Sequence, residues 1–436
     1  MTHRIMIIGG GAGGLPLATA LADAHGRGGR AEITLVDPNA THLWKPLLHE
    51  VAAGRVGAQE GDVSYAAVAK RNGFRFVRGA MTGLDRGRRQ IAVRRVSDRE
   101  GATDTQATLE YDTLVVCVGS ETHDWGVPGV RDRAVMLDTP RQAERFRRDL
   151  LIAGVRADAR RGTTGTGGIE VVIVGAGATA VELAAEIRRT TRAQAAYMPA
   201  RLDLDRDVRL TLLEAAPRIL PLLADRIAAS VGSLLSALGI DVRTGERVVE
   251  VTAAGVRTAR GALFPADFVV WAAGIRAPAW LAGLDGLETD RVNRLVVDTT
   301  LRTTRDPDVF AFGDCAACPW PESGEQALLP PRAQVARQQA VMLVDTIGAR
   351  LDGRALPVFR YRGFGSLASL GELSGAGGFL GRLVGGSLLL QTFTARSTFA
   401  LLHFMHQVSI HGTGQVLRDT LARWVHGGGE ARMKLH

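Results

Sequence analysis

The stretch of sequence that decides the fold is a glycine-rich turn near the amino terminus, Gly9-Gly10-Gly11-Ala12-Gly13-Gly14. The apolar run Ile5–Ile8 precedes it and the apolar segment Leu15–Ala24 follows it, which predicts a strand, a tight turn and a helix. Glycines at the first, third and sixth positions of the turn let the backbone approach a pyrophosphate at the helix N-terminus. Asp37 ends the next expected strand, Ile33–Val36, where its carboxylate can accept a hydrogen bond from a ribose hydroxyl.

A second turn of the same kind reads Gly175-Ala176-Gly177-Ala178-Thr179-Ala180. The polar linker Gly162–Gly168 precedes this unit, and its strand and helix are expected at Val171–Val174 and Val181–Arg189. Two strand–turn–helix units of this type predict an α/β chain with two Rossmann-like dinucleotide-binding domains.

The acidic residue of the second unit is Glu214, which ends the expected strand Leu210–Leu213. A carboxylate at this position suits a ribose with a free 2′-hydroxyl, so we expect NADH rather than NADPH. Glu214 lies farther from its turn than the usual ~20 residues, and we expect the polar stretch Arg188–Asp207 to form a helix extension or a loop. Arg218 is near enough in the sequence to leave NADPH open.

Composition excludes several classes of protein. With 436 residues, 46% hydrophobic and 22% charged, the chain can bury a full core, which excludes disorder and coiled coil. No apolar run reaches the roughly 18 residues of a spanning helix, and the start of the chain resembles no export leader. The three cysteines cannot build a disulfide framework.

The net charge of +8 comes mostly from arginine, since lysine occurs only at Lys45, Lys70 and Lys434. The basic residues are dispersed rather than gathered in blocks. We therefore expect no nucleic-acid binding, and favour a basic face toward an anionic partner such as a membrane surface. Because almost every basic residue of this chain is arginine, a position that is lysine instead is of interest, and we therefore consider Lys45 a candidate functional residue.

Two dinucleotide sites in one chain indicate a flavoprotein in which hydride passes from a nicotinamide to a bound flavin. The pattern resembles the flavoproteins with two dinucleotide domains, of the glutathione-reductase-like fold. Their second flavin motif is similar to Val309-Phe310-Ala311-Phe312-Gly313-Asp314, and the resemblance implies that Asp314 contacts the flavin ribitol. Their strand-ending glycine motif between the domains is similar to Trp271-Ala272-Ala273-Gly274, which implies that Gly274 borders NADH.

The segment that follows the first unit distinguishes the members of this group. It reads His42-Leu43-Trp44-Lys45-Pro46-Leu47-Leu48-His49-Glu50, without the redox cysteine pair of the disulfide reductases. Together with the AQxAxQ signature at Ala333, Gln334, Ala336 and Gln338, it resembles the type II NADH:quinone oxidoreductases. Pro330 and Pro331 favour a helix start, and Gln334 and Gln338 fall on one helix face, where neutral amides suit a quinone. The alternative is an ordinary helix with exposed glutamines.

Two further residues are candidates for chemistry. We expect Glu182 in the first turn of its helix, where an acid can simply complement the helix dipole. The resemblance instead implies a glutamate where nicotinamide meets flavin, which positions nicotinamide or protonates the quinone. Lys45 is either a surface lysine or a cation beside the flavin ring that favours the anionic reduced form.

Cys315 and Cys318 are spaced as a CxxC pair, beside the second flavin motif. Such a pair can be redox-active or supply half of a zinc site, but a second cysteine pair for zinc is missing and we expect no metal. The favoured interpretation is a packed helix start.

The carboxyl-terminal stretch, residues 376–436, predicts membrane-docking helices. Leu401, Phe404, Met405 and Val408 share one helical arc, and Leu417, Leu421, Trp424 and Val425 share another. Apolar arcs flanked by arginine suit helices that lie in the membrane interface, as the resemblance also implies. The alternative is that these arcs pack on the protein or on a second subunit, so a homodimer stays open.

These observations predict an FAD domain formed by residues 1–120 and 277–375, an NADH domain at 121–276 and a membrane element at 376–436. The expected activity is the transfer of two electrons from NADH through FAD to a membrane quinone without proton pumping, at the cytoplasmic face of the inner membrane. One alternative is a related flavin reductase of the sulfide:quinone or ferredoxin reductase type. Another is a basic NADH-sensing flavoprotein that binds DNA and resembles apoptosis-inducing factor.

Overall fold

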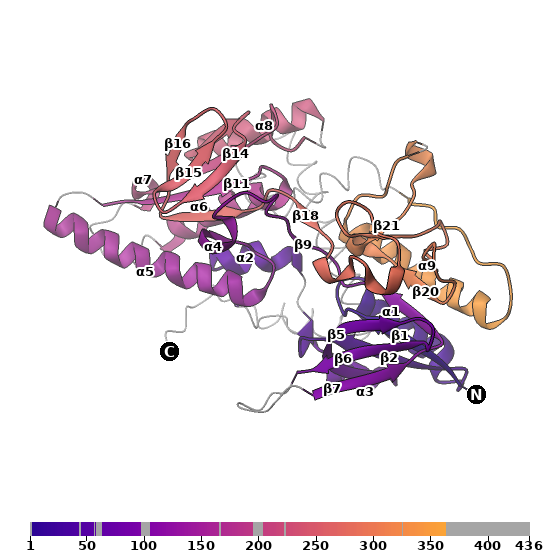
Figure 1. Ribbon diagram of the computed structural model, residues 1–436. Coiled ribbons are helices and arrows are strands. Elements are labelled where there is room, and N and C mark those ends of the chain that lie inside the picture. Colours follow the sequence, from indigo (N-terminus) through magenta and orange to yellow (C-terminus); the bar gives the residue numbers. More distant parts are fainter. Residues whose placement is uncertain are drawn as a thin grey trace, which may run out of the picture.

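The computed structural model describes residues 2–42, 45–55, 57, 63–96, 105–164, 167–194, 204–221, 224–324 and 326–362. Each of the two glycine turns follows a strand of a different sheet, and the two sheets lie in separate lobes (Figure 1). The predicted carboxyl-terminal helices lie outside the described residues. Among the helices of the described ranges, none is both long and apolar enough to cross a membrane.

The first lobe is built on a sheet with the strand order β20-β8-β1-β2-β5-β6-β7. Its strands are β1 (His3–Ile8), β2 (Ala31–Asp37), β5 (Arg75–Asp85), β6 (Gln90–Arg95), β7 (Thr105–Glu110), β8 (Thr113–Val116) and β20 (Val309–Ala311). Strands β20 to β5 are parallel, and β6 and β7 continue the sheet antiparallel. Because β1 lies inside the parallel part, its apolar run is buried on both faces.

Helices cover this sheet and connect its strands. They are α1 (Gly14–Leu21), a π-helical turn (Ala22–Gly26), α3 (Tyr65–Asn72) and α9 (Ala333–Leu351). Helix α9 packs on α1 although the two are distant in sequence. With β20, it shows that this lobe is made from both ends of the described chain.

The second lobe holds a parallel sheet with the order β10-β17-β11-β12-β13. Its strands are β10 (Ala134–Val135), β11 (Ile169–Val174), β12 (Val208–Glu214), β13 (Ile240–Thr244) and β17 (Phe268–Trp271). An antiparallel meander beside it comprises β14 (Val248–Thr252), β15 (Gly255–Thr258) and β16 (Leu263–Pro265). Its helices are α4 (Val130–Arg133), α5 (Pro140–Thr164), α6 (Ala178–Gln194), α7 (Leu204–Asp207) and α8 (Asp225–Ala237).

Two boundaries differ from the sequence-based expectation. Helix α5 continues to Thr164, so the linker expected from Gly162 is partly helical. Helix α6 begins at Ala178, inside the glycine turn, and continues to Gln194, which accounts for part of the long interval before Glu214 as the expected helix extension.

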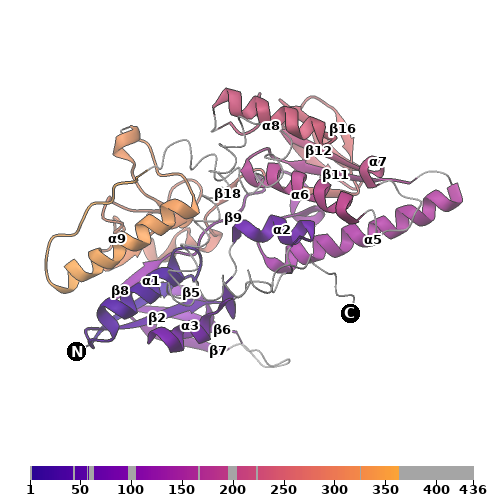
Figure 2. The same cartoon turned by 180° about the vertical axis from the view of Figure 1, so that it is seen from behind.

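The chain crosses between the lobes through β9 (Glu121–Thr122) and β18 (Ile275–Arg276), which pair antiparallel. A third connection was not predicted. Helix α2 (Leu48–Ala53) follows the first strands in sequence but packs on α5 and α6 of the second lobe (Figures 1 and 2). Leu48 and Val51 join the buried apolar core of that lobe, so α2 joins the two lobes.

The remaining short elements complete the fold. They are strands β3 (Thr41–His42), β4 (Val63–Ser64), β19 (Leu295–Val296) and β21 (Ala316–Ala317), and 3-10 helices η2 (Lys45–Leu47), η4 (Ala279–Leu281), η5 (Leu284–Gly286), η6 (Gly313–Cys315) and η7 (Pro321–Ser323).

Candidate active site

The first glycine turn is shaped to receive a phosphate group. Gly9 has φ +101° and its N–H donates to the Val36 carbonyl at 2.9 Å, which ends β1 beside β2. A Cβ added at Gly14 would lie 1.9 Å from the Gly9 carbonyl oxygen, so α1 approaches the turn too closely for a side chain. A Cβ added at Gly11 would meet none of the described atoms within 4 Å, so the turn is open on that side. Open backbone amides at a helix N-terminus fit a pyrophosphate.

Asp37 ends β2 beside this turn and is buried. One of its carboxylate oxygens accepts the Gly10 N–H at 2.7 Å, and the other accepts the Asn39 N–H at 2.8 Å. Burial raises the pKa of Asp37, and these hydrogen bonds oppose that shift. The second oxygen also accepts the Asn39 side-chain amide at 3.0 Å, so the oxygen that accepts the Gly10 N–H is the one that keeps accepting capacity for a ribose hydroxyl.

Two buried rings that we did not predict support the same turn. The Tyr65 hydroxyl donates to the Gly10 carbonyl at 2.9 Å, and the His42 ring meets Tyr65 edge-on at 6.1 Å between centroids. Burial lowers the pKa of His42 to about 4, while a hydrogen bond with the Gly10 backbone acts in the opposite direction. The neutral imidazole and the phenol therefore fix the backbone that Asp37 also holds.

The second glycine turn repeats this construction. Gly175 has φ +97° and its N–H donates to the Leu213 carbonyl at 2.7 Å. Glu214 ends β12, and its two carboxylate oxygens accept the N–H groups of Ala176 at 2.7 Å and Ala216 at 2.8 Å. A Cβ at Gly177 would again meet none of the described atoms within 4 Å. The parallel is close, because Glu214 holds Ala176 as Asp37 holds Gly10.

Arg218 already has partners away from Glu214. Its guanidinium lies 3.1 Å from an Asp225 carboxylate oxygen and donates to the Pro221 carbonyl at 2.7 Å. These contacts engage the Arg218 guanidinium, the group for which NADPH was kept as an alternative coenzyme.

Gly274 lies three residues beyond the carboxyl end of β17, which is Trp271, and has φ +110°. A Cβ at Gly175 would lie 2.7 Å from the Ala272 carbonyl oxygen, so the two glycine-containing strand ends are in close contact. In a parallel sheet the crevice beyond the carboxyl ends of such neighbouring strands is where a dinucleotide binds.

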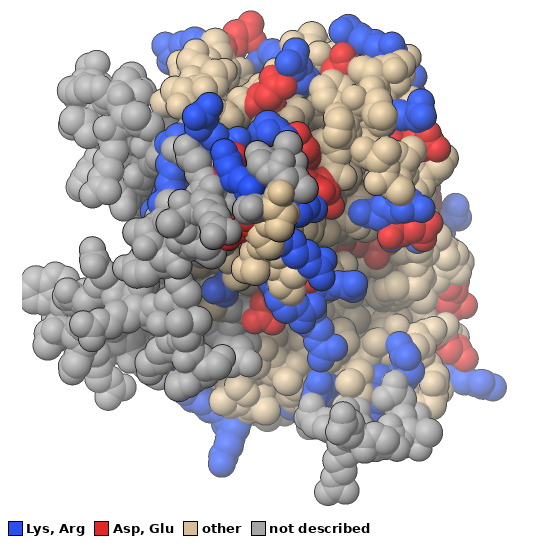
Figure 3. All heavy atoms as spheres, turned by 90° about the vertical axis from the view of Figure 1, so that its left-hand side faces the viewer, with Lys and Arg blue, Asp and Glu red and all other residues tan. Residues whose placement is uncertain are grey.

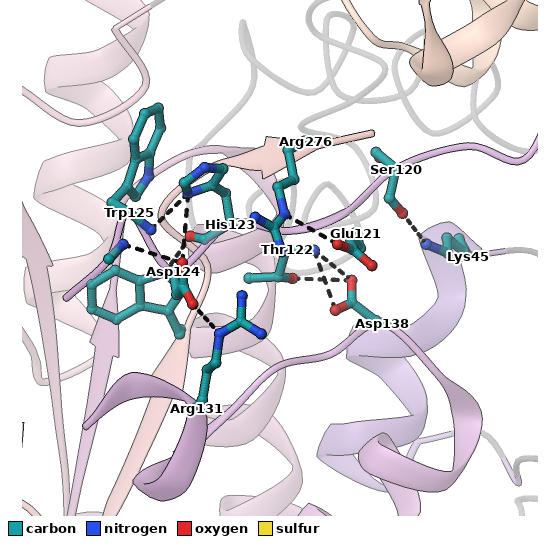
Figure 4. Close-up of polar contacts among 12 residues, drawn as sticks. Lys45, Ser120, Glu121, Thr122, His123, Asp124, Trp125, Arg131, Asp138 and Arg276 are labelled. Carbon is teal, nitrogen blue, oxygen red and sulfur yellow. Dashed lines mark hydrogen bonds and ion pairs between the residues drawn. The ribbon is translucent and has the colours of Figure 1, made fainter. Parts of the chain in front are cut away.

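Asp314, Ser120 and Lys45 meet near the crossing between the lobes. The Ser120 hydroxyl donates to the half-buried Asp314 carboxylate at 2.9 Å. Lys45 Nζ donates to the Ser120 carbonyl at 2.7 Å, as Figure 4 shows. Burial raises the pKa of Asp314, and the Ser120 hydrogen bond and the Lys45 charge oppose that shift. Lys45 is exposed to solvent. It nevertheless lies near Asp314, the aspartate that we predicted to contact the flavin.

The signature helix α9 begins at Ala333, and Arg332 separates it from the two prolines. The Gln338 amide binds the backbone of Arg362, accepting its N–H at 3.0 Å and donating to its carbonyl at 3.1 Å. The neighbouring Gln339, which we did not single out, is buried and accepts the Gly313 N–H at 2.9 Å. Gln339 therefore holds the turn that carries Asp314.

Glu182 is the fifth residue of α6 and is 8% exposed. Our expectation that it lies in the first turn was wrong, because the helix begins at Ala178 rather than after the glycine turn. The favourable interaction of an acid with the helix dipole is confined to the first turn, so it does not explain why Glu182 is placed in a buried position. The unpredicted neighbour is His49 of α2, whose Nε2 lies 3.6 Å from a Glu182 carboxylate oxygen.

Burial lowers the pKa of His49 to about 4, and the nearby Arg55 acts in the same direction. A neutral imidazole on α2, which packs against the second lobe, therefore faces Glu182. Arg55 lies 3.2 Å from Glu186 on α6 and 3.6 Å from Glu50 on α2. These ion pairs hold α2 against α6 and thereby keep His49 beside Glu182.

Comparison with known proteins identifies the family. Residues 3–340 match the pyridine nucleotide-disulphide oxidoreductases. The chain is 35% identical over 450 residues to the type II NADH:quinone oxidoreductase of Haemophilus influenzae, covering 99% of this chain and 100% of that protein. The chain belongs to the type II NADH:quinone oxidoreductases.

Two further relatives agree with this assignment. The Staphylococcus aureus enzyme of the same name is 27% identical over 389 residues, covering 88% of this chain and 91% of that protein. The structure of NDH2 from Plasmodium falciparum in complex with NADH shares the fold, with a TM-score of 0.70 and 16% identity, over 94% of this chain and 99% of that one. The family predicted from the two turns, the segment around Lys45 and the AQxAxQ signature is confirmed.

Cys315 and Cys318 of this type II oxidoreductase have the surroundings of packed thiols, which favours the packing interpretation over a redox pair. Cys315 and Cys318 are both buried and free, and burial raises the pKa of each thiol to about 12. They are packed as expected but not at a helix start, because Cys315 ends the 3-10 helix η6 and Cys318 follows strand β21. Neutral buried thiols are poor nucleophiles.

Proposed function

We propose that this type II NADH:quinone oxidoreductase accepts two electrons as hydride from NADH and delivers them to a quinone. The observation that carries the proposal is the pair of equivalent glycine turns, each with its own ribose carboxylate, on either side of Lys45, Ser120 and Asp314. FAD, when bound, supplies a carrier that takes up hydride and releases two electrons.

The residues of the first lobe fit FAD. Gly9, Gly11 and Gly14 would receive its pyrophosphate at the start of α1, and Asp37 its adenosine ribose. The open approach at Gly11 and the carboxylate already fixed on Gly10 support this assignment.

The other end of the flavin would lie between the turn at Gly313 and the start of α9. Asp314 would accept a ribitol hydroxyl, and the backbone amides of Ala333 and Gln334 would face the ring. Among the described residues no side chain caps the start of α9, which leaves these amides available. Lys45 would place a cation beside the ring and favour its anionic reduced form.

The second lobe would hold NADH. Gly175 and Gly177 would approach its pyrophosphate, Ala180 would let α6 pack closely on the sheet, and Gly274 would border the nicotinamide end. Glu214 would bind the adenosine ribose and repel a 2′-phosphate, so NADH is the coenzyme. The engagement of Arg218 with Asp225 and Pro221 supports this choice.

Glu182 would act at the meeting point of nicotinamide, flavin and quinone. Glu182 is buried beside His49, and a carboxyl group held at a reaction centre is a group that can transfer a proton. Gln334 and Gln338 would offer amide N–H groups to the quinone carbonyls, and Gln338 would first have to release the Arg362 backbone.

We assign residues 1–120 and 277–375 to the FAD domain, 121–276 to the NADH domain and 376–436 to the membrane element. The sheet memberships support the discontinuous FAD domain, since β20 completes the sheet that β1 begins.

Docking to the cytoplasmic face of the inner membrane would bring the quinone within reach through the carboxyl-terminal helices. The described part of the molecule adds positive charge, because Lys and Arg side chains gather on the face that includes the outer end of α5 (Figure 3). Helix α5 itself carries Arg141, Arg145, Arg147, Arg148, Arg156, Arg160 and Arg161 against Glu144, Asp149 and Asp158, so it has a positive net charge. Such charge attracts anionic lipid. No proton would cross the membrane during turnover, and the functional form would be a homodimer or a monomer.

The absorbance spectrum of the purified protein tests the proposal. We expect a flavin spectrum that NADH bleaches and that a soluble quinone analogue restores. A flavin that NADH reduces but quinone leaves reduced would contradict the quinone assignment and favour a protein acceptor. Tight, salt-sensitive DNA binding without quinone turnover would favour the DNA-binding alternative.

A further inference from the structure

The tryptophan at position 125 is held in an unusual conformation at the surface. Its φ is +53°, in the left-handed region that bulky residues rarely occupy, and its side chain is 59% exposed. A large apolar ring in a strained and exposed position does not contribute burial to the core. Such an outlier persists where the surrounding structure fixes it for a function.

The surroundings of Trp125 fix the ring firmly. Its indole N–H donates to the Ala273 carbonyl, and its backbone N–H donates to His123 Nδ1 at 2.6 Å (Figure 4). The two rings lie 4.4 Å apart between centroids. The His123 carbonyl in turn accepts the Trp271 indole N–H at 2.8 Å, which anchors this pair to the end of β17.

The backbone on either side of Trp125 is also held. The Asp124 carboxylate accepts the Gly126 N–H at 3.1 Å and pairs with Arg131. A Cβ added at Gly274 would lie 2.8 Å from the Trp125 indole nitrogen, so the ring requires glycine at that position. The strand-ending glycine therefore makes room for the indole as well as for a ligand.

The position of the Trp125 ring determines which half of a bound dinucleotide it can contact. Ala273 and Gly274 follow the end of β17 at Trp271, and the Ala272 carbonyl lies against the glycine turn that follows β11. Glu214 marks the adenosine side of this crevice, at the end of β12 on the other side of β11. Trp125 lies on the β17 side, which in a dinucleotide fold is the nicotinamide half.

We propose that the Trp125 indole is a wall of the NADH site that contacts the nicotinamide riboside half of the coenzyme. This inference rests on the proposed function of the second glycine turn as the NADH site. An indole presented in a fixed orientation gives contact area without a loss of side-chain freedom on binding, and its face suits an aromatic or cationic nicotinamide ring.

The test uses the flavin-loaded full-length protein and two probes, NAD⁺ and ADP-ribose, which lacks the nicotinamide. Trp125→Gly removes the ring and relieves the positive φ, so it should keep its FAD and its thermal stability. We expect its Kd for NAD⁺ to rise roughly tenfold while its Kd for ADP-ribose stays within twofold, roughly the spread of such measurements. Trp125→Phe keeps a ring and should fall between wild type and Trp125→Gly.

The matched control is Trp280→Ala, which removes another exposed tryptophan, on the 3-10 helix η4, whose Leu281 packs in the core of the first lobe. This variant should bind both probes as wild type does. Unchanged NAD⁺ binding in Trp125→Gly, or equal weakening of NAD⁺ and ADP-ribose, would overturn the inference. If instead NADH fails to reduce the wild-type flavin, the proposed function fails before any variant is compared.

Discussion

Glu214 and Asp37 have equivalent positions beside the two glycine turns, so the same carboxylate-to-amide substitution can be tested at both. Glu214→Gln replaces one carboxylate oxygen by an amide that cannot accept a hydrogen bond. One of the N–H groups of Ala176 and Ala216, at 2.7 and 2.8 Å, then loses its acceptor, and the ribose loses an anionic partner. Hydrogen bonds to charged groups contribute about 1.5–3 kcal/mol, so we expect kcat/KM for NADH to fall about 10- to 100-fold.

The same change should also reduce the preference for NADH over NADPH. The wild-type carboxylate repels the 2′-phosphate, and the amide does not, so activity with NADPH should be retained or improved. Initial rates with both coenzymes, at a fixed concentration of a soluble quinone analogue, measure this preference. A Glu214→Gln variant that discriminates as wild type does would mean that another group, such as Arg218, sets coenzyme choice.

Asp37→Asn is the matched control, because Asp37 holds Gly10 and Asn39 as Glu214 holds Ala176 and Ala216. We expect this variant to lose FAD on purification, measured by the ratio of flavin to protein absorbance. The fraction that keeps FAD should prefer NADH as strongly as wild type. A shift of coenzyme preference in Asp37→Asn would refute the assignment of one turn to each dinucleotide.

Three further predictions concern other parts of the molecule. Glu182→Gln should keep FAD but slow flavin reduction or reoxidation, by roughly 10²- to 10⁴-fold for a proton-transfer role, as stopped-flow spectroscopy would measure; wild-type rates in both half-reactions would exclude that role. The free energy of unfolding should fall as pH drops from 6.5 to 4, because the depressed pKa values of His42 and His49 mean that the unfolded chain takes up protons first. Each histidine contributes at most about 3 kcal/mol to this loss, and His49→Gln should flatten the pH dependence in denaturant titrations. Deletion of residues 396–436 should keep FAD and activity with a soluble quinone but abolish binding to anionic vesicles; a flavin-loaded truncation that still sediments with them would contradict the membrane role.

The parts of the fold that local sequence specifies were predictable. The apolar runs that became β1 and β11 lie directly before glycine turns, and Asp37 and Glu214 each end the next strand. These features depend on neighbours in the chain, so the apolar runs and the residues that follow them locate the turns and carboxylates, Glu214 included despite its long interval from the turn. The choice of partners across the chain has no such local signal, which is why the contacts of Tyr65 with the first turn were not predicted.

Gln339 is a case in which a signal was present but not used. Val335, Gln339 and Leu343 recur at a spacing of four, and all three are buried on α9. A polar residue within an apolar helix stripe indicates a buried hydrogen bond, which here goes to the Gly313 N–H. We singled out Gln334 and Gln338 instead, since their neutral amides suited a quinone.

The segment that includes Lys45 has a role that only the three-dimensional arrangement reveals. The short helix η2, which begins at Lys45, leads directly into α2, so one continuous segment places a cation near Asp314 and a helix against α6. Arg55 fastens the far end of that segment to Glu186 in the other lobe. A shift of the lobes relative to each other would therefore move Lys45 and His49 together. Because Asp314 belongs to one lobe and Glu182 to the other, this segment couples the geometry of the FAD site to that of the NADH site.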